Sequence, residues 1–240
     1  MVRACRKAWQ SGLTSGSSSF PATCSARQSR TSPMLDVHAP ALPEKRGQRL
    51  GREEYLRDFR ARDAAIRNGD SWKLERLQHF EEVGSPSRDA LRRGDWGMAL
   101  RLLDEGRDNL RAIQADDEAR GSAFHRVRVV EEPLRPYVQW ELHSLRISAE
   151  YGERVRILPA GAVAAAEADG LLPELTIQDG KVLFRVLYTD TGVPDGAIRF
   201  TDPDIVEPWT EYVRDAYATA EDIASYFDRA VAPLSPPPAA

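Results

Sequence analysis

The spacing of hydrophobic residues changes from a helical period to a strand period about half-way along the chain. In the first half, apolar positions recur at helical spacing over 52–67 and again over 95–113, which predicts two helices. Gly69 is typical of a residue that ends a helix, and Ser85, which proline follows, predicts the start of a short helix between the other two. The segment 72–80 fits either a strand or a helix, and we favour a strand.

The second half of the chain follows a strand period. Residues 124–131 and 154–158 predict two strands, and the segment between them predicts a helix that begins at Pro133 and ends near Tyr151. A strand–helix–strand unit of this kind is expected to be parallel and right-handed.

A hairpin and a helical C-terminal segment follow this unit. Asp179-Gly180 separates two apolar runs, which predicts a β-hairpin. A strand over 197–200 comes next, and helices run from Asp202 to about Val231. Together the patterns predict an α+β fold. It has a helix-rich N-terminal half, then a βαβ unit and a β-hairpin that form a mixed sheet, then C-terminal helices.

Charge is distributed unevenly. The chain has 33 Lys and Arg against 37 Asp and Glu, a net charge of -4, but its first 33 residues hold five basic residues and no acidic one. Removing those five positive charges takes -4 to -9. Such a segment is typical of a transit peptide; alternatively Met34 is the true start, which we favour. We expect a disordered leader over 1–50, one domain over 52–231 and a disordered, proline-rich tail over 232–240.

Composition excludes several classes of protein. An apolar fraction of 42% is too high for a fully disordered chain, and no apolar run approaches the ~20 residues of a membrane helix. The cysteines are too few for a four-cysteine zinc site, and the histidines show no metal-binding spacing. The chain has no phosphate-binding loop, nucleophile elbow or phospholipase-D-type motif. We expect no cofactor, no metal, no membrane partner and, because the body is acidic, no direct binding of nucleic acid.

The predicted helix over 133–151 has two apolar sides. Leu142 and Leu145 lie on one side, with Glu141 beside it, and Trp140 lies on nearly the opposite side. Such a helix is buried on both sides, or it presents one side to a partner. We favour burial under the helices of the first half, whereas an exposed Trp140 would indicate a partner surface.

Arginines recur on the predicted strands. Because two strands repeat Val-Arg-Val and Val-Arg-Ile, Arg128 and Arg156 are expected to share a face opposite the valines if these strands are neighbours. Two guanidinium groups on one face could bind a carboxylate or a phosphate. The alternative, which we favour, is a solvent-exposed face on which the arginines pair with nearby acids such as Glu131 and Glu153.

Two segments resemble a known family. They are Ser71 to Phe80, and Arg126 to Leu142 followed by Gly152 to Leu158. They are similar to an uncharacterised actinobacterial family, domain of unknown function 6879, over about residues 52–231. The resemblance implies a small intracellular, cytoplasmic protein, often encoded beside helix-turn-helix regulators, and it implies no established activity. The residues that match the family pattern are Arg128, Glu131, Pro133, Tyr137, Trp140, Glu141 and Leu142.

Two functional hypotheses follow. The first is a non-enzymatic regulatory module that binds a protein partner, such as a helix-turn-helix regulator. The second is an enzyme that binds a small molecule or a phosphate ester on an arginine-lined sheet face. The second predicts a cavity where the arginines converge with a carboxylate of perturbed pKa. The candidate residues for binding a ligand or partner are Arg128, Glu131, Tyr137, Trp140, Glu141 and Arg156.

Overall fold

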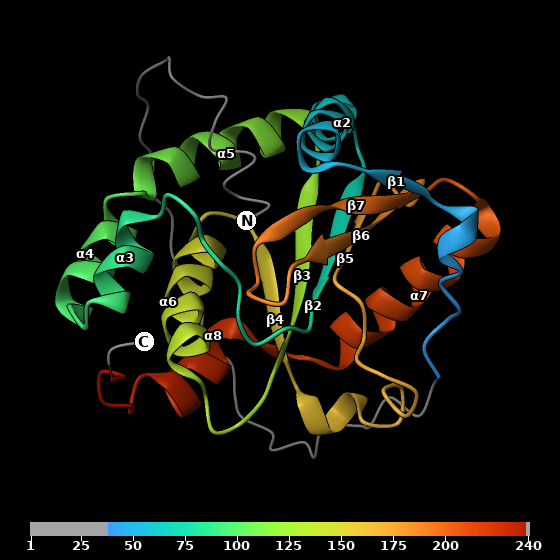
Figure 1. Cartoon of the computed structure of the whole chain (residues 1–240). Coiled ribbons are helices and arrows are strands. Elements are labelled where there is room, and N and C mark those ends of the chain that lie inside the picture. The colour runs from blue at the N-terminus through green and yellow to red at the C-terminus, as the bar shows by residue number, and fades with distance from the viewer. Residues whose placement is uncertain (1–37, 239–240) are drawn as a thin grey trace.

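A computed structural model describes residues 38–238, which form an α+β fold around one mixed sheet (Figure 1). The prediction for residues 1–33 lies outside this range. The sheet has eight strands in the order β1-β7-β6-β5-β2-β3-β4-β8. The strands are β1 (Gln48–Leu50), β2 (Asp70–Glu75), β3 (Ala123–Val130), β4 (Arg154–Pro159), β5 (Leu175–Gln178), β6 (Val182–Tyr188), β7 (Pro194–Phe200) and β8 (Glu221–Asp222).

Helices connect the strands and cover the sheet. They are α2 (Arg52–Ala65), α3 (Pro86–Arg92), α4 (Trp96–Asp104), α5 (Arg107–Arg120), α6 (Pro136–Glu150), α7 (Pro203–Thr219) and α8 (Ile223–Tyr226). Short turns of 3₁₀-helix span Glu44–Arg46 and Ala160–Val163, and a π-helical turn spans Phe227–Val231. Among these described helices, none combines the length and the apolar character needed to cross a bilayer.

The connections that the sequence predicts are confirmed. Strands β3 and β4 are parallel neighbours joined through α6. The structure adds β2, which pairs with β3 in parallel on the other side. Strands β5 and β6 form an antiparallel hairpin. At its turn Asp179 and Gly180 have φ angles of 53° and 62°, the left-handed conformation that an Asp-Gly turn provides. The predicted N-caps are also present, since the side chains of Ser85 and Asp202 accept hydrogen bonds from backbone N–H groups of α3 and α7.

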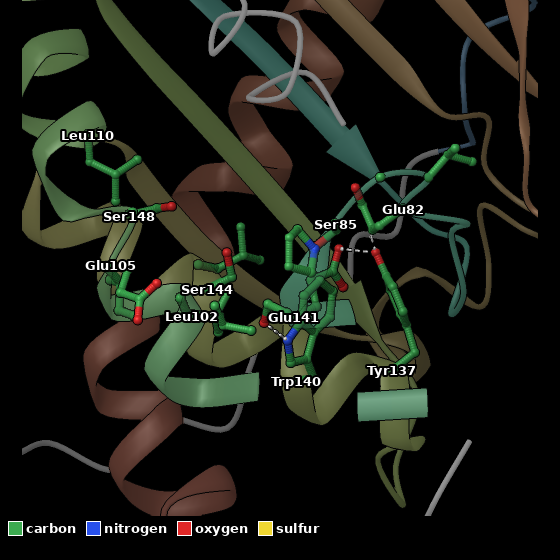
Figure 2. Close-up of a pocket in the computed structure, with 18 of the residues that line it drawn as sticks. Glu82, Ser85, Leu102, Glu105, Leu110, Tyr137, Trp140, Glu141, Ser144 and Ser148 are labelled. Carbon is green, nitrogen blue, oxygen red and sulfur yellow. Dashed lines mark hydrogen bonds between the residues drawn. The ribbon is translucent and has the colours of Figure 1, made fainter. Parts of the chain in front are cut away.

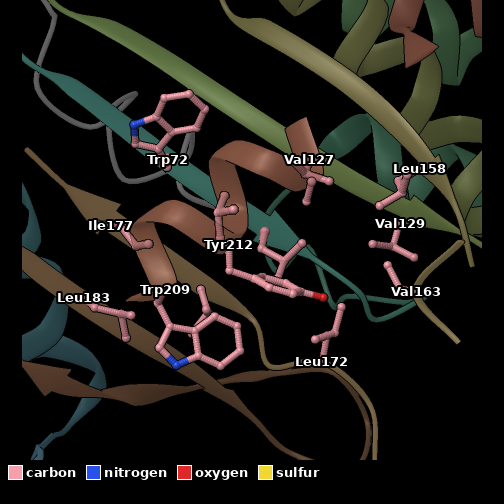
Figure 3. Close-up of a cluster of buried hydrophobic side chains, with 14 of the residues drawn as sticks. Trp72, Val127, Val129, Leu158, Val163, Leu172, Ile177, Leu183, Trp209 and Tyr212 are labelled. Atoms are coloured by element: carbon pink, nitrogen blue, oxygen red, sulfur yellow. The ribbon is translucent and has the colours of Figure 1, made fainter. Parts of the chain in front are cut away.

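Apolar residues cover both faces of the sheet. On one face α7 packs on the central strands, and its Trp209 and Tyr212 lie in one apolar cluster with Val127 and Leu183 (Figure 3). The opposite face carries two separate apolar clusters. One lies under α2 and includes Phe59 and Phe184, and the other lies under α3, α4, α6 and α8 and includes Val138 and Ile157.

Three predicted boundaries are wrong. The segment 95–113 contains two helices, because the chain turns at Glu105 and Gly106 between α4 and α5. Helix α6 begins at Pro136, not Pro133; a proline fits the first turn of a helix at either place, so the pattern alone does not choose. Strand β1 lies within the predicted leader and pairs with β7 at the sheet edge, because Leu50 gains full burial there.

The second apolar side of α6 is covered by neighbouring helices, as the favoured interpretation predicts. Trp140 is only 5% exposed, and its indole N–H donates to Ser87 Oγ of α3 at 2.8 Å. The Ser87 hydroxyl donates in turn to the carbonyl of Ala99 in α4 at 2.7 Å. A short chain of hydrogen bonds therefore ties α6 to both helices.

Candidate functional site

Two central strands carry charged side chains on a face that is covered by helices. In β2 and β3 the charged residues Lys73, Glu75, Arg126 and Arg128 alternate with the apolar residues that face α7. Lys73 lies beside Arg126 in the pairing register, and Glu75 lies beside Arg128. All four are between 0% and 3% exposed. They lie between the α2 cluster and the α6 cluster, where charge is costly to bury unless it is paired.

Glu75 is the centre of this charged network. Its two carboxylate oxygens accept hydrogen bonds from Lys73 Nζ and from Arg126 Nη1. Arg126 Nε also donates to Glu153 Oε1 at 2.6 Å. Burial opposes ionisation of Glu75, but the positive charges of Arg126, Lys73 and Arg128 hold the pKa of its carboxyl well below the usual range. Glu75 is therefore a carboxylate throughout the neutral range.

A second pair joins the sheet to α6. Nε and Nη2 of Arg128 lie 2.8 and 2.7 Å from Oε2 of Glu141, and the Nε–H contact has the geometry of a hydrogen bond. Arg128 Nη1 also donates to the carbonyl of Val129 at 3.0 Å. Burial raises the pKa of Glu141, and Arg128 opposes that rise. Burial would lower the pKa of Arg128, but the carboxylates of Glu141, Glu75 and Glu174 raise it, so the guanidinium stays charged.

Tyr137 places a phenol beside this pair. Its hydroxyl donates to Glu82 Oε1 at 3.2 Å and lies 3.4 Å from Glu141 Oε1. Burial, with the nearby charges of Glu141 and Glu82, holds the pKa of the Tyr137 hydroxyl well above its usual value. The phenol therefore remains a hydrogen-bond donor to the carboxylates at neutral pH.

A cavity of about 480 Å³ opens onto the charged network between the sheet, α6 and the α3–α4 pair (Figure 2). It extends from Tyr137 and Glu82 at one end toward Leu110 and Ser148 at the other (Figure 2). The charged and phenolic groups on its wall include Glu75, Glu82, Arg126, Tyr137 and Glu141. The apolar groups on its wall include Leu102, Leu103, Leu110, Trp140 and Leu145.

A comparison with models of known protein families found a match over most of the chain. The model of a family described as Domain of unknown function (DUF6879) matches residues 58–228, from α2 to the turn after α8. The chain belongs to the DUF6879 family. The comparison with curated proteins found no match for this chain.

Four of the six predicted site residues of this DUF6879 protein come together at the cavity. Tyr137, Trp140 and Glu141 line it, and Arg128 lies behind Glu141. Glu131 lies apart from the cavity wall, where its carboxylate accepts from Arg76 Nη1 at 2.8 Å. Among the described residues, no group of three or more His, Cys, Asp or Glu side chains is arranged to hold a metal ion.

Arg156 is separated from Arg128 by the sheet, so the predicted shared arginine face is wrong. In the parallel pairing of β3 with β4, Arg156 lies beside Val127, whereas Arg128 lies beside Ile157. Neighbours in register share a face, so Arg156 belongs to the α7 side and Arg128 to the cavity side. The predicted solvent-exposed arginine face is also wrong for Arg128, which is fully buried.

Three further residues of this DUF6879 protein belong to the charged network and are not among the predicted site residues: Lys73, Glu75 and Arg126. The available signal was the alternation of charged and apolar residues in two predicted strands, which the structure places inside the sheet. Central parallel strands are covered on both faces. Charged residues at alternate positions there are therefore buried, and they must find partners of opposite charge.

Proposed function

We propose that this DUF6879 protein binds a small organic molecule in the cavity beside α6. The observation that carries the proposal is a cavity of about 480 Å³ whose wall includes buried, ionised side chains of the sheet. Ligand pockets typically enclose about 300–1,000 Å³ and combine an apolar lining with a few fixed polar groups. Carboxyl and phenol groups with perturbed pKa values inside a cavity also favour a functional site.

The charge balance of the wall indicates the class of ligand. Both arginines of the network are already paired with carboxylates, Arg126 with Glu75 and Glu153, and Arg128 with Glu141. A phosphate ester would have to displace those carboxylates, so the geometry does not favour it. A molecule with an apolar body and a neutral, hydrogen-bonding end fits better, with its polar end beside Tyr137 and Glu141.

The partner hypothesis loses the support that an exposed Trp140 would have given, because the indole is buried and hydrogen-bonded. We therefore base the proposed function on the cavity. Any partner surface has to lie elsewhere on the molecule.

A cavity-filling variant tests the proposal. Ser144 lies on the cavity wall, and Ser144→Phe is expected to abolish ligand binding by occupying the space. Small neutral metabolites would be screened by thermal unfolding, with native mass spectrometry to establish a 1:1 complex. For a ligand at a hundredfold excess over its Kd, binding adds about 2.7 kcal/mol, which raises the Tm of wild type by several degrees.

Ser225→Phe is the matched control, because Ser225 is an exposed serine on α8 and does not line the cavity. This variant is expected to bind like wild type. Failure of every screened compound to bind the wild-type protein would count against the proposal. Equal binding by Ser144→Phe and wild type would place the ligand outside the cavity.

A further inference from the structure

Three arginines gather on the face of the sheet opposite the cavity. Arg154 and Arg156 are alternate residues of β4 and point to the α7 side, and Arg214 comes from α7 itself. Arg154 and Arg214 are exposed, and Arg156 is half-buried. We call these three residues the arginine patch.

Among residues 38–238, the arginine patch differs from the charged network of the cavity in having no ion partner. Within the described part of the chain, none of the three guanidinium groups has a carboxylate within 4.0 Å. The arginines of the cavity network, by contrast, are each paired with a glutamate. Charge at the patch is therefore available to a partner.

Aromatic rings hold the three arginines in place. Arg156 lies 4.5 Å from the ring centroid of Tyr217, and Arg214 lies 5.4 Å from that of Trp72. Arg154 Nη1 lies 3.0 Å from Nε2 of His125, whose ring stacks on Trp72. Arg156 Nη1 also donates to the carbonyls of Tyr217 and Ala218, at 3.0 and 3.3 Å, so one edge of this guanidinium is used by α7. A guanidinium stacked on a ring can still offer the other edge of its donor fork to a carboxylate. The patch is thus pre-arranged before any partner arrives.

The neighbouring strand edge adds backbone groups to this surface. Strand β8 pairs with β4 only at Arg156 and Ile157. Beyond that pairing, no described strand lies on the outer side of Arg154 and Val155. Side chains at alternate positions of a strand are about 6.6 Å apart, and the same spacing separates alternate side chains of any extended peptide. Acids at alternate positions of such a peptide therefore match Arg154 and Arg156.

We propose that the arginine patch is a docking site for an extended acidic segment of a partner protein, with carboxylates at alternate positions. The segment lies along the open edge of β4 at Arg154 and Val155, ends where β8 pairs with β4, and places its acids beside Arg154, Arg156 and Arg214. Asp70 lies beside His125, and Asp222 lies beside Arg156 in the pairing of β8 with β4, so two carboxylates border a patch whose centre carries three arginines. This site is independent of the cavity, which lies on the other face of the sheet.

Fluorescence polarisation with a labelled peptide of alternating Glu and Ser tests the proposal. The wild-type protein is expected to bind the peptide at low ionic strength and to release it as salt is added. Arg154→Ala/Arg214→Ala is expected to weaken binding at least about tenfold, since two charge-assisted contacts are lost. Both side chains are exposed, and circular dichroism checks that this double variant folds.

Arg93→Ala/Arg101→Ala removes two exposed arginines at the ends of α3 and α4 and leaves the net charge equal to that of the test variant. It is expected to bind like wild type. A peptide with Gln in place of Glu is expected not to bind. The proposal is overturned if the acidic peptide does not bind, if both double variants lose binding equally, or if inorganic pyrophosphate binds at the patch and the peptide does not.

Discussion

Arg128→Met is expected to lower the free energy of unfolding by about 3–5 kcal/mol. Arg128 is completely buried, and both Nε and Nη2 lie within 2.8 Å of Oε2 of Glu141. Without the guanidinium, Glu141 is left in the interior with the Tyr137 hydroxyl 3.4 Å from its Oε1. Most of the loss comes from that uncompensated carboxylate, and less of it from the pairing energy itself. Urea unfolding followed by tryptophan fluorescence measures the change.

The double variant Arg128→Met/Glu141→Leu separates these two contributions. Because it removes both charges and keeps similar volumes, we expect it to recover most of the stability lost in the single variant. Arg146→Met is the control for an exposed pair. Its side chain is 33% exposed and contacts Glu150 at 3.1 Å, so its removal should cost less than about 1 kcal/mol. A double variant as unstable as Arg128→Met alone would contradict the coupling of Arg128 with Glu141.

Local patterns predict most of the elements, because the information they need is local. The hairpin at Asp179-Gly180 requires two residues with positive φ, and an Asp-Gly pair supplies them whatever surrounds it. Parallel pairing of β3 with β4 follows from the helix between them. A tight turn joins antiparallel strands, whereas parallel neighbours need a long crossover of this kind.

Which face of a strand meets solvent is not a local property. The sequence Val-Arg-Val is compatible with an Arg128 that faces water and with one that faces α6. Which of the two occurs depends on helices that are distant in the sequence. Helix α2 covers one side of the charged network and α6 covers the other, so the arginine is buried. The register between β3 and β4 is also set by the whole sheet. A shift of one residue would have placed Arg156 on the cavity face.

The burial of Trp140 also depends on both local sequence and distant elements. The helical period predicts that it lies on a second apolar side, but only the docking of α3 and α4 shows what covers that side. The cavity itself is formed by residues from β2, β3, α3, α4, α5 and α6 and from the segments between them. Their convergence depends on how whole helices and strands pack together. The sequence therefore predicts some of the residues that line the cavity, but not the cavity itself.

Glu174 is expected to make the protein progressively less stable as the pH rises from about 4.5 to about 7, with no further loss above that range. The residue is 5% exposed, and burial, with the nearby charge of Glu75, raises the pKa of its carboxyl to about 7. The unfolded chain ionises at the ordinary value of 4.5. A carboxyl whose pKa is higher in the folded state stabilises the fold fully below the unfolded pKa. That contribution is lost as the pH rises through the folded pKa. The difference corresponds to about 3 kcal/mol once both states are ionised.

Glu174→Gln is expected to remove the dependence of stability on pH that Glu174 causes, while the backbone hydrogen bonds of the side chain are kept. Oε1 of Glu174 accepts from the backbone N–H groups of Arg76 and Leu77, each at 2.6 Å, and a glutamine carbonyl can accept both bonds. The stability of the variant relative to wild type should therefore rise by up to about 3 kcal/mol between about pH 5 and about pH 8.5. Glu54→Gln, at an exposed carboxylate of α2, shows the effect of losing one charge alone. If the Glu174→Gln difference were constant across this range, the carboxyl would not titrate near pH 7, and burial would not be its dominant influence.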